Sequence, residues 1–436
     1  MSVQQTPVAS DALARGTVNR VLWRLMPFLF LCYVVAYLDR VNIGFAATQL
    51  QRDLGLSDAA YGWGAGIFFL GYCLFEIPSN LVLERVGARR WIARIMVSWG
   101  LVSMGMALVR GPSSFYAVRV LLGIAEAGFF PGIILYLTYW VPAADRARAG
   151  AFFMAAGPVS AIVGAPVSGA LLELHGWLGL AGWQWLFVIE GVPAIVLGVV
   201  TWRYLTDRPE DASWLSDDQR RWLTSEMDRE RAARASHQRG GELHALASGR
   251  VWLLGVIYFL NALVNYGVFL WLPKILHDAS ALRNVALGVV TAIPFVLSLG
   301  AMVLVGRHSD RTGERKWHAV GCALTAAAGL LLAALFPAHF PLLVLSLALS
   351  ELGHRSTLAV FWAIPPIFLA GSAAAAGIAL INSIGNLGGA VGPTVVGWLR
   401  SGSGGYTSGL LFLTGCLVLQ ALLIASLRIS KEKGRR

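Results

Sequence analysis

Two short stretches of this sequence match each other at a distance: "NLVLERVGARR" at residues 80–90 and "GRHSDRTGERK" at residues 306–316. Both fit the pattern G-x-x-x-[DE]-R-x-G-x-[RK]-[RK], with Asn80 in place of the first glycine. Their acids, Glu84 and Asp310, lie 226 residues apart in a chain of 436 residues. A basic loop that recurs once per half indicates two related halves, which is the pattern of parallel repeats in membrane transporters.

The composition around these loops is that of a membrane protein. The chain is 56% hydrophobic and 14% charged, whereas a soluble domain carries about 25% charged residues. Apolar runs long enough to cross a hydrocarbon core of ~30 Å recur along the chain. We expect an all-α polytopic fold with twelve transmembrane helices in two six-helix bundles. The predicted spans are residues 22–46, 60–83, 90–109, 114–139, 147–171, 183–204, 251–275, 284–306, 317–336, 340–365, 372–399 and 407–428.

These spans divide the chain into five segments. We expect a cytoplasmic tail at 1–21, an N-terminal bundle at 22–204, a linker at 205–250, a C-terminal bundle at 251–428 and a basic tail at 429–436. In the linker, Ser216–Gln219 fits a helix-opening capping box, and Trp222, Leu223 and Met227 would give that helix an apolar stripe. The glycines of "GWGAG" (62–66) indicate close packing between membrane helices.

The placement of basic residues predicts the orientation. Of the 35 Lys and Arg residues, 27 fall in the tails and in the loops on the same side as the tails. The positive-inside rule therefore puts both termini in the cytoplasm, and the net charge of +11 reflects topology and not nucleic-acid binding. The four cysteines lie within apolar runs without metal-ligand spacing, so we expect no metal site.

Arg40 and Asp39 are adjacent charges inside the first span, where a charge costs roughly 2.5–3.5 kcal/mol on insertion scales. Tyr33, Tyr37 and Arg40 share one helix face. Arg cannot deprotonate in a protein, so it needs an anion, either a substrate carboxylate taken bidentately or an acid on another helix. Asp39 points about 100° away from Arg40; it is either a coupling-proton site or a structural acceptor.

The fourth span places Arg119, Gly123 and Glu126 on one face. Glu126 falls near mid-membrane and is a second candidate for a proton site. Arg119 is either its partner or a charge of the outer vestibule. Glu76 and Glu190 precede prolines near bends, where we expect them to bond freed backbone groups.

The tenth span holds Glu351, His354 and Arg355. Glu351 and Arg355 either neutralise each other at i, i+4, or Arg355 provides a second anion contact from the C-terminal half. In the second case His354 is a candidate proton carrier, because its unperturbed pKa lies near neutrality. Polar groups at helical spacing on two further spans either contact substrate or join helices: Asn261, Asn265 and Tyr266, and Asn382 and Asn386.

The duplicated loop resembles the signature of the major facilitator superfamily, and it occurs in the corresponding loops of a six-plus-six layout. The resemblance implies that the loop charges latch the cytoplasmic ends of the two halves together in one state. Elementary electrostatics agrees, because an acid stabilises a neighbouring helix N-terminus. The alternative is that the basic residues only anchor the topology. The expected gating residues are Glu84, Arg85, Arg89, Asp310, Arg311 and Arg315.

Within that superfamily the chain is most similar to the anion:cation symporter family, which includes bacterial permeases for tartrate, phthalate, 4-hydroxyphenylacetate and sugar acids. The resemblance implies that Arg40 binds the substrate carboxylate, that Asp39 and Glu126 carry coupling protons, and that Tyr72 and Asn386 contact substrate. The stretches that carry it are "YLDRVNIGFA" (37–46), "FFLGYCLFEIPSNLVLERVGARR" (68–90), "LLGIAEAGFFPGIILYLTYWVP" (121–142), "WQWLFVIEGVPA" (183–194) and "GIALINSIGNLGGAVGP" (377–393).

Two departures from that family bear on the substrate. "ELGHR" (351–355) stands where relatives usually carry small and apolar residues, and a glutamine of galactonate-type members is missing from "AFFMAAGPVSAIVG" (151–164). Both weaken a sugar-acid assignment, and an extra arginine suits a dicarboxylate or a substituted aromatic acid.

The resulting expectation is a proton-coupled symporter, not an enzyme, that imports an organic carboxylate across a bacterial-type inner membrane. It would work as a monomer with protons and one small organic anion as its partners and without any cofactor. The alternatives are a sugar-acid symporter, a drug/proton antiporter of the same fold and, from a different class, a non-transporting membrane sensor. The last would need an output domain, and the linker is too small to be one.

Overall fold

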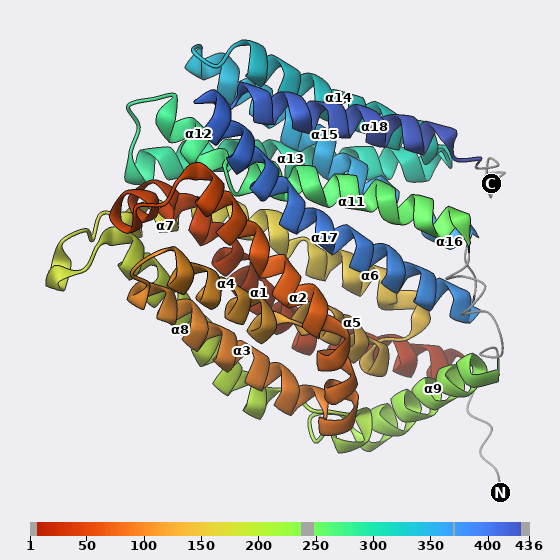
Figure 1. The fold of residues 1–436 in the computed structure, drawn as a ribbon. Coiled ribbons are helices and arrows are strands. Elements are labelled where there is room, and N and C mark those ends of the chain that lie inside the picture. Colours follow the sequence, from red (N-terminus) through yellow and green to blue (C-terminus); the bar gives the residue numbers. More distant parts are fainter. Residues whose placement is uncertain (1–6, 237–247, 369–370, 429–436) are drawn as a thin grey trace, which may run out of the picture.

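The structure is a computed structural model that describes residues 7–236, 248–368 and 371–428. The described residues are almost entirely helical (Figure 1). The predicted tail at 429–436, the start of the tail at 1–21 and part of the predicted linker at 205–250 lie outside the described residues.

Among the described residues, eight α-helices of the N-terminal half precede the predicted linker. Its helices are α1 (Pro7–Leu54), α2 (Asp58–Val86), α3 (Ala88–Gly105), α4 (Pro112–Glu126), α5 (Phe129–Trp140), α6 (Ala143–Met154), α7 (Ala156–Leu172) and α8 (Gly182–Tyr204), with 3-10 turns η1 (Met106–Leu108) and η2 (Trp177–Gly179) between them.

Two of the predicted spans in the N-terminal half are broken, which corrects the expectation of single continuous helices at 114–139 and 147–171. The first break lies between α4 and α5, where Gly128 adopts a left-handed φ of 87° that glycine tolerates far better than other residues. The second lies between α6 and α7 at Ala155. There Pro158 has no N–H to bond the carbonyl four residues earlier. Both breaks lie in helices that face α1.

The C-terminal half repeats this plan. Its helices are α11 (Gly249–Phe269), α12 (Leu272–Asp278), α13 (Asn284–Thr312), α14 (Lys316–Leu335), α15 (Phe340–Phe361), α16 (Pro365–Phe368), α17 (Gly371–Ser403) and α18 (Thr407–Ser426). The predicted span at 251–275 is also not one continuous helix, because it is interrupted between α11 and α12, close to Pro273.

Ten segments among the described residues are long and apolar enough to cross a membrane by length and composition. Helices α15 and α17 are not among the ten, and in α15 the polar stretch with Glu351, His354 and Arg355 lowers the hydropathy. The multi-pass membrane fold is therefore clear, while the count of twelve spans stays a prediction.

Helix α9 (Asp217–Ser236) follows the 3-10 turn η3 (Pro209–Asp211) and occupies the first part of the predicted linker. It opens with the predicted capping box: Gln219 N donates to Ser216 Oγ at 3.3 Å, and Ser216 N donates to Gln219 Oε1 at 3.3 Å. Leu223 and Met227 of the predicted apolar stripe are buried. The helix packs on α1 and α5, so this helix belongs to the N-terminal half.

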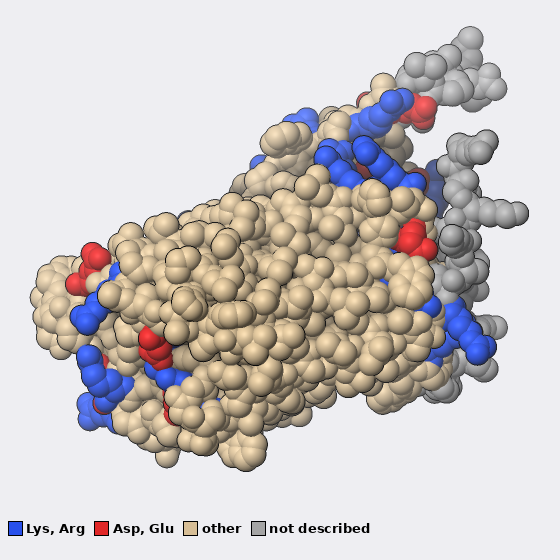
Figure 2. Space-filling model, turned by 90° about the horizontal axis from the view of Figure 1, so that it is seen from above, with Lys and Arg blue, Asp and Glu red and all other residues tan. Residues whose placement is uncertain are grey.

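The two halves lie side by side, with α17 packed along α2 and α13 along α7 (Figure 1). The beginning of α1, the end of α18 and helix α9 all lie at one end of the molecule, which we call the terminal end. Helix α12 and the α7–α8 connection lie at the other, which we call the far end. In Figure 2 charged side chains gather at these two ends and a band of uncharged surface separates them, as a membrane protein requires.

The halves are closed against each other at the far end. Arg400 of α17 is bonded to Asp58 of α2, and its second amino group donates to Asp278 of α12 at 2.8 Å. The Arg400 guanidinium also lies 4.4 Å from the centre of the Tyr406 ring. Next to this cluster, Ala59 N donates to Ser401 Oγ at 2.9 Å across the same boundary.

Candidate functional site

The centre of the candidate site is an ion pair between two predicted site residues of the N-terminal bundle, Arg40 of α1 and Glu126 of α4. Arg40 Nε donates to Glu126 Oε1 at 2.7 Å, and its terminal NH2 group lies 2.5 Å from the same oxygen. The Arg40 side chain is 12% exposed and that of Glu126 is 1% exposed. Glu126 is the last residue of α4, directly before the break at Gly128. The partner of Glu126 is thus Arg40, and not Arg119.

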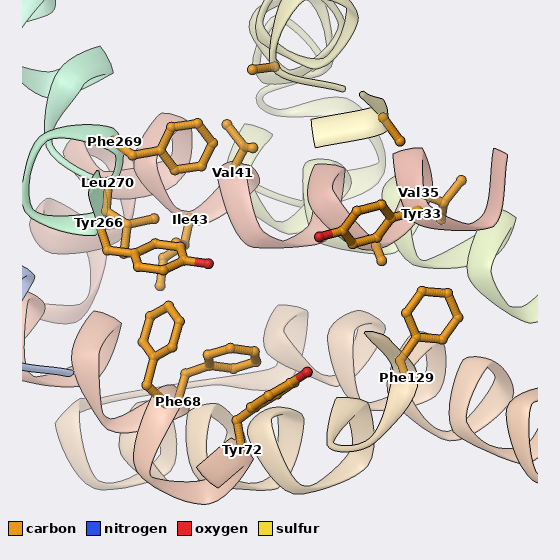
Figure 3. Packing of buried hydrophobic residues seen from close by; sticks show 14 of the residues in the cluster. Tyr33, Val35, Val41, Ile43, Phe68, Tyr72, Phe129, Tyr266, Phe269 and Leu270 are labelled. Atoms are coloured by element: carbon orange, nitrogen blue, oxygen red, sulfur yellow. The ribbon is translucent and has the colours of Figure 1, made fainter. Parts of the chain in front are cut away.

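Aromatic side chains from both halves surround Arg40. The guanidinium carbon lies 5.2 Å from the Tyr72 ring centre and 5.7 Å from that of Tyr37, distances at which a ring attracts a cation. From the C-terminal half, Tyr266 accepts a hydrogen bond from Arg40 at 3.4 Å. Tyr33 packs edge-on to Tyr37, 5.4 Å between ring centres. Figure 3 shows the hydroxyl groups of Tyr33, Tyr72 and Tyr266 directed toward one region between the helices.

A second arginine reaches this region from the C-terminal half. Arg355 Nε donates to Glu351 Oε2 at 3.2 Å, so these two residues do form the expected pair along their own helix. The guanidinium also lies 5.9 Å from the Phe269 ring, against which Tyr37 packs at 6.3 Å. Tyr37 is within electrostatic range of Arg355. Tyr37 is thus a common neighbour of Arg40 and Arg355.

Nitrogen atoms of Arg355 and of its neighbour His354 have no hydrogen-bond partner among the described residues. The Arg355 NH2 group and both ring nitrogens of His354 are buried and unbonded. Buried polar groups are nearly always hydrogen-bonded, so these atoms are positions where a ligand or water would be stabilised.

Asp39 faces away from Arg40, as its helical position predicts, and lies inside the N-terminal bundle. It accepts hydrogen bonds from Trp99 Nε1, from Ser103 Oγ at 2.5 Å and from Asn42 Nδ2 at 3.0 Å. Trp99 and Ser103 belong to α3, and neither could be picked out in sequence as a partner of Asp39. This arrangement meets the description of a structural acceptor, and the coupling-proton role of Asp39 stays a prediction.

The asparagines of α17 bond an acid of α2. Asn382 Nδ2 and Asn386 Nδ2 donate to the two oxygens of Glu76 at 3.1 and 3.3 Å. Glu76 therefore links α2 to α17 across the boundary between the halves and does not bond freed backbone, which corrects that expectation. In α11, the buried Asn261 Nδ2 and Asn265 Oδ1 have no partner among the described residues.

Arg119 is fully inside the N-terminal bundle. Its Nε and NH2 groups donate to the backbone oxygens of Gly64 and Ala65 in α2, at 3.1 and 3.2 Å. These bonds join α4 to α2. The Arg119 guanidinium also lies 4.9 Å from the centre of the Phe68 ring, and its two backbone bonds give Arg119 a joining role.

The loop charges at the terminal end are paired within their own halves. Arg89 N donates to Asp207 Oδ1 at 2.8 Å, and Arg315 is paired with Asp310. Glu84, Arg85 and Arg311 are exposed. In this conformation the described residues contain no ion pair between the two loops, so the latch between them stays a prediction for another state. Within the same residues, no group of three or more His, Cys, Asp or Glu side chains is placed to hold a metal.

Comparisons with known proteins place this geometry in context. A family model described as "Major Facilitator Superfamily" matches residues 29–393 and 254–436. The chain is 52% identical to a "Putative tartrate transporter" of Agrobacterium vitis, with 97% of each chain covered. It is 40% identical to a "Quinolone resistance transporter" of Acinetobacter baumannii, covering 96% of this chain and 97% of that protein.

The fold is also found among solved structures. The inward-facing, occupied form of a bacterial homologue of the human lysosomal transporter Spinster superposes with a TM-score of 0.73. The two share 19% sequence identity, with 92% of this chain and 95% of the other covered. At that identity the likeness concerns the fold alone.

Proposed function

This chain belongs to the major facilitator superfamily, and from that premise we propose that it is a proton-coupled symporter that imports a small hydroxylated dicarboxylate of the tartrate type. Membership also makes the chain a multi-pass membrane transporter and not an enzyme. The relatives in bacteria support an inner-membrane location, and both termini are proposed to be cytoplasmic.

The observation that carries the proposal is the pair of arginines contributed by opposite halves to one aromatic region. Arg40 comes from α1 and Arg355 from α15; Tyr37 lies beside Arg40 and is within electrostatic range of Arg355. Arginine binds carboxylates through two parallel hydrogen bonds. A dicarboxylate held by one guanidinium at each end would bridge the two halves, and the 52% identity to a tartrate transporter points to the same substrate class.

Proton coupling follows from the way in which Arg40 is already neutralised. Its Nε and NH2 groups both contact Glu126, so a substrate carboxylate that binds there displaces Glu126. The displaced acid is buried and loses its counter-charge, which favours its protonation. Substrate and proton would therefore enter the occluded site together, and neither alone would satisfy the charges.

A second candidate function is efflux of a drug in exchange for protons, which the 40% identity to a quinolone resistance transporter favours. The two functions differ in direction. A symporter accumulates substrate inside liposomes or cells when the outside is more acidic, whereas an antiporter expels it under the same gradient. The relatives do not favour a sugar-acid symporter over the tartrate type.

The test is a thermal-shift panel on the purified chain with tartrate, phthalate, 4-hydroxyphenylacetate, galactonate and the monocarboxylate lactate. A ligand that binds the folded state raises the melting temperature by mass action. We expect stabilisation by tartrate in the wild type and in the control Arg110→Ala, whose side chain lies exposed in a far-end loop, and its loss in Arg355→Ala.

Because Arg355→Ala leaves Glu351 unpaired in the interior, the double variant Glu351→Gln/Arg355→Gln provides the matched comparison. It removes both charges of the pair together. Tartrate stabilisation that survives in this double variant would rule out Arg355 as the second carboxylate contact. Uptake of labelled tartrate into proteoliposomes with an acidic exterior then tests the direction and the coupling.

A further inference from the structure

A groove runs between α3 and α8 on the outer side of the N-terminal bundle. Helix α3 begins at Ala88 and α8 ends at Tyr204, and Arg89 N donates to Asp207 Oδ1 just beyond α8, so both helices reach the terminal end there. Their main packing partners are each other and further helices of the N-terminal half. Both lie on the side of the molecule away from the C-terminal half (Figure 1), so the groove between them opens toward the surrounding lipid.

The floor of the groove is formed where small residues bring the two helices together. A Cβ atom on Gly198 of α8 would lie 3.1 Å from the backbone oxygen of Ala93 and 2.8 Å from Cγ2 of Val97, both in α3. Larger side chains line the groove around this contact, with Leu101 57% exposed and Val199 50% exposed. The cavity has a volume of about 710 Å³ and a mostly apolar lining. Such a lining favours an acyl chain over a polar ligand.

Three arginines also line the groove, and they come from its terminal end: Arg90, Arg94 and Arg203. Arg94 lies six residues after the start of α3, which is about 9 Å along a helix. Its guanidinium lies 3.9 Å from the centre of the Trp91 ring, and one of its amino groups donates to Ser98 Oγ at 3.4 Å. Arg94 Nε is buried and has no hydrogen-bond partner.

The charges of these three arginines are not neutralised by the protein. The adjacent Arg89 is paired with Asp207, whereas no carboxylate in the described part of the chain forms an ion pair with any of the three. An arginine side chain stays charged in a protein, and a charge near hydrocarbon is costly unless it finds a partner. The counter-anion therefore has to come from outside the chain.

The membrane itself offers an anion with the right chemistry. Guanidinium groups bind phosphate through paired hydrogen bonds, and basic pockets between membrane helices bind the headgroups of anionic lipids on the cytoplasmic side. A zwitterionic headgroup brings a cation of its own and would leave the arginines uncompensated. A headgroup with a net negative charge would compensate them.

We propose that the α3–α8 groove binds one anionic phospholipid, with its phosphate at Arg94 and Arg203 and an acyl chain along Ala93 and Gly198. The headgroup would then join the start of α3 to the end of α8. The site uses none of the residues around Arg40, so the proposal does not rest on the transport function proposed above.

Native mass spectrometry of the purified full-length chain in detergent tests this site, because it counts the lipids that stay bound. Dioleoylphosphatidylglycerol is the anionic probe, and dioleoylphosphatidylcholine has the same acyl chains with a zwitterionic headgroup. We expect the wild type to bind one phosphatidylglycerol about 10-fold or more tightly than phosphatidylcholine, since charged hydrogen bonds to the phosphate are reinforced by net charge. Arg94→Gln/Arg203→Gln should lose this preference.

The matched control is Arg307→Gln/Lys316→Gln, which removes two positive charges at the ends of α13 and α14 in the other half. It should keep the preference for phosphatidylglycerol. If the control loses as much preference as Arg94→Gln/Arg203→Gln, the effect reflects overall charge and the proposal is wrong. Equal binding of the two lipids by the wild type would also overturn it.

Val199→Trp tests the groove separately from the arginines. The larger side chain fills the groove, leaves all three arginines in place and starts from a half-exposed position on the outer surface. We expect it to weaken phosphatidylglycerol binding about as much as the loss of the two arginines. Wild-type binding in Val199→Trp would put the lipid outside the groove and overturn the site. Melting temperatures of all variants verify that the compared proteins are folded.

Discussion

At the scale of single residues, the partners of the buried arginines distinguish their roles. Arg119 bonds backbone oxygens that cannot leave, and Arg355 bonds a carboxylate on its own helix. Arg40 bonds an acid on a different helix, at the end of α4 beside a break. A carboxylate that belongs to another, interrupted helix is the partner most easily exchanged for a substrate carboxylate.

Replacement of Arg40 by lysine should therefore remove most ligand binding. Lysine offers a single point charge where the guanidinium places two N–H groups on one carboxylate. Since a charged hydrogen bond contributes about 1.5–3 kcal/mol, we expect tartrate affinity to fall about 10- to 100-fold. Isothermal titration measures this directly, with Arg52→Lys as the control because its side chain is 66% exposed. Near-normal affinity in Arg40→Lys would remove Arg40 from the site.

The sequence predicted which residues share one face of a helix, but it did not predict which residues of other helices they bond. The i, i+4, i+7 spacing correctly put Tyr33, Tyr37 and Arg40 together, because α1 is one regular helix there. It paired Glu126 with Arg119 as one option, whereas the structure pairs it with Arg40. The bonds from Asn382 and Asn386 to Glu76 join residues about 300 positions apart, and helical periodicity contains no information about such distances.

At the scale of elements, small residues let α2 and α17 approach closely at the far end. A Cβ atom on Gly62 would lie 2.5 Å from the Pro393 oxygen and 3.1 Å from Gly397 Cα. The neighbours are backbone atoms, which cannot move aside as a flexible side chain would. The expectation of close helix packing at "GWGAG" is confirmed here, although the sequence could not identify α17 as the partner.

Gly62→Val should therefore keep the far end from closing and shift the population toward a state open at that end. The reporter is Ala390→Cys, a buried α17 position, in a background without the four native cysteines. We expect faster labelling by a membrane-impermeant thiol reagent when Gly62→Val is added. Gly415→Val is the matched control, because a Cβ there meets nothing within 4 Å. Equal labelling rates in the two valine variants would contradict this account of closure.

At the scale of the whole molecule, the duplicated loops and apolar runs were sufficient to predict two related halves. They did not predict at which end the two halves are closed against each other. The structure closes the far end through Arg400, Asp58 and Asp278, and the positions of these three residues along the chain do not indicate that they meet. The predicted latch of the terminal-end loops is not formed here, since their charges pair within each half. A sequence encodes every state of a transporter, so pattern alone cannot select one.

If the halves alternate between two closures, a covalent link across the far end should stop transport without stopping binding. Ala59 of α2 and Ser401 of α17 are in direct contact across the boundary, 2.9 Å between Ala59 N and Ser401 Oγ. In a background without native cysteines, oxidation of Ala59→Cys/Ser401→Cys should abolish tartrate uptake into proteoliposomes, and reduction should restore it. Thermal stabilisation by tartrate should persist in the oxidised protein, because the terminal end remains free to open. The single variant Ala59→Cys, which cannot form the link, should transport alike under oxidising and reducing conditions. Uptake by the oxidised Ala59→Cys/Ser401→Cys protein at the reduced rate would mean that transport does not require the far end to open.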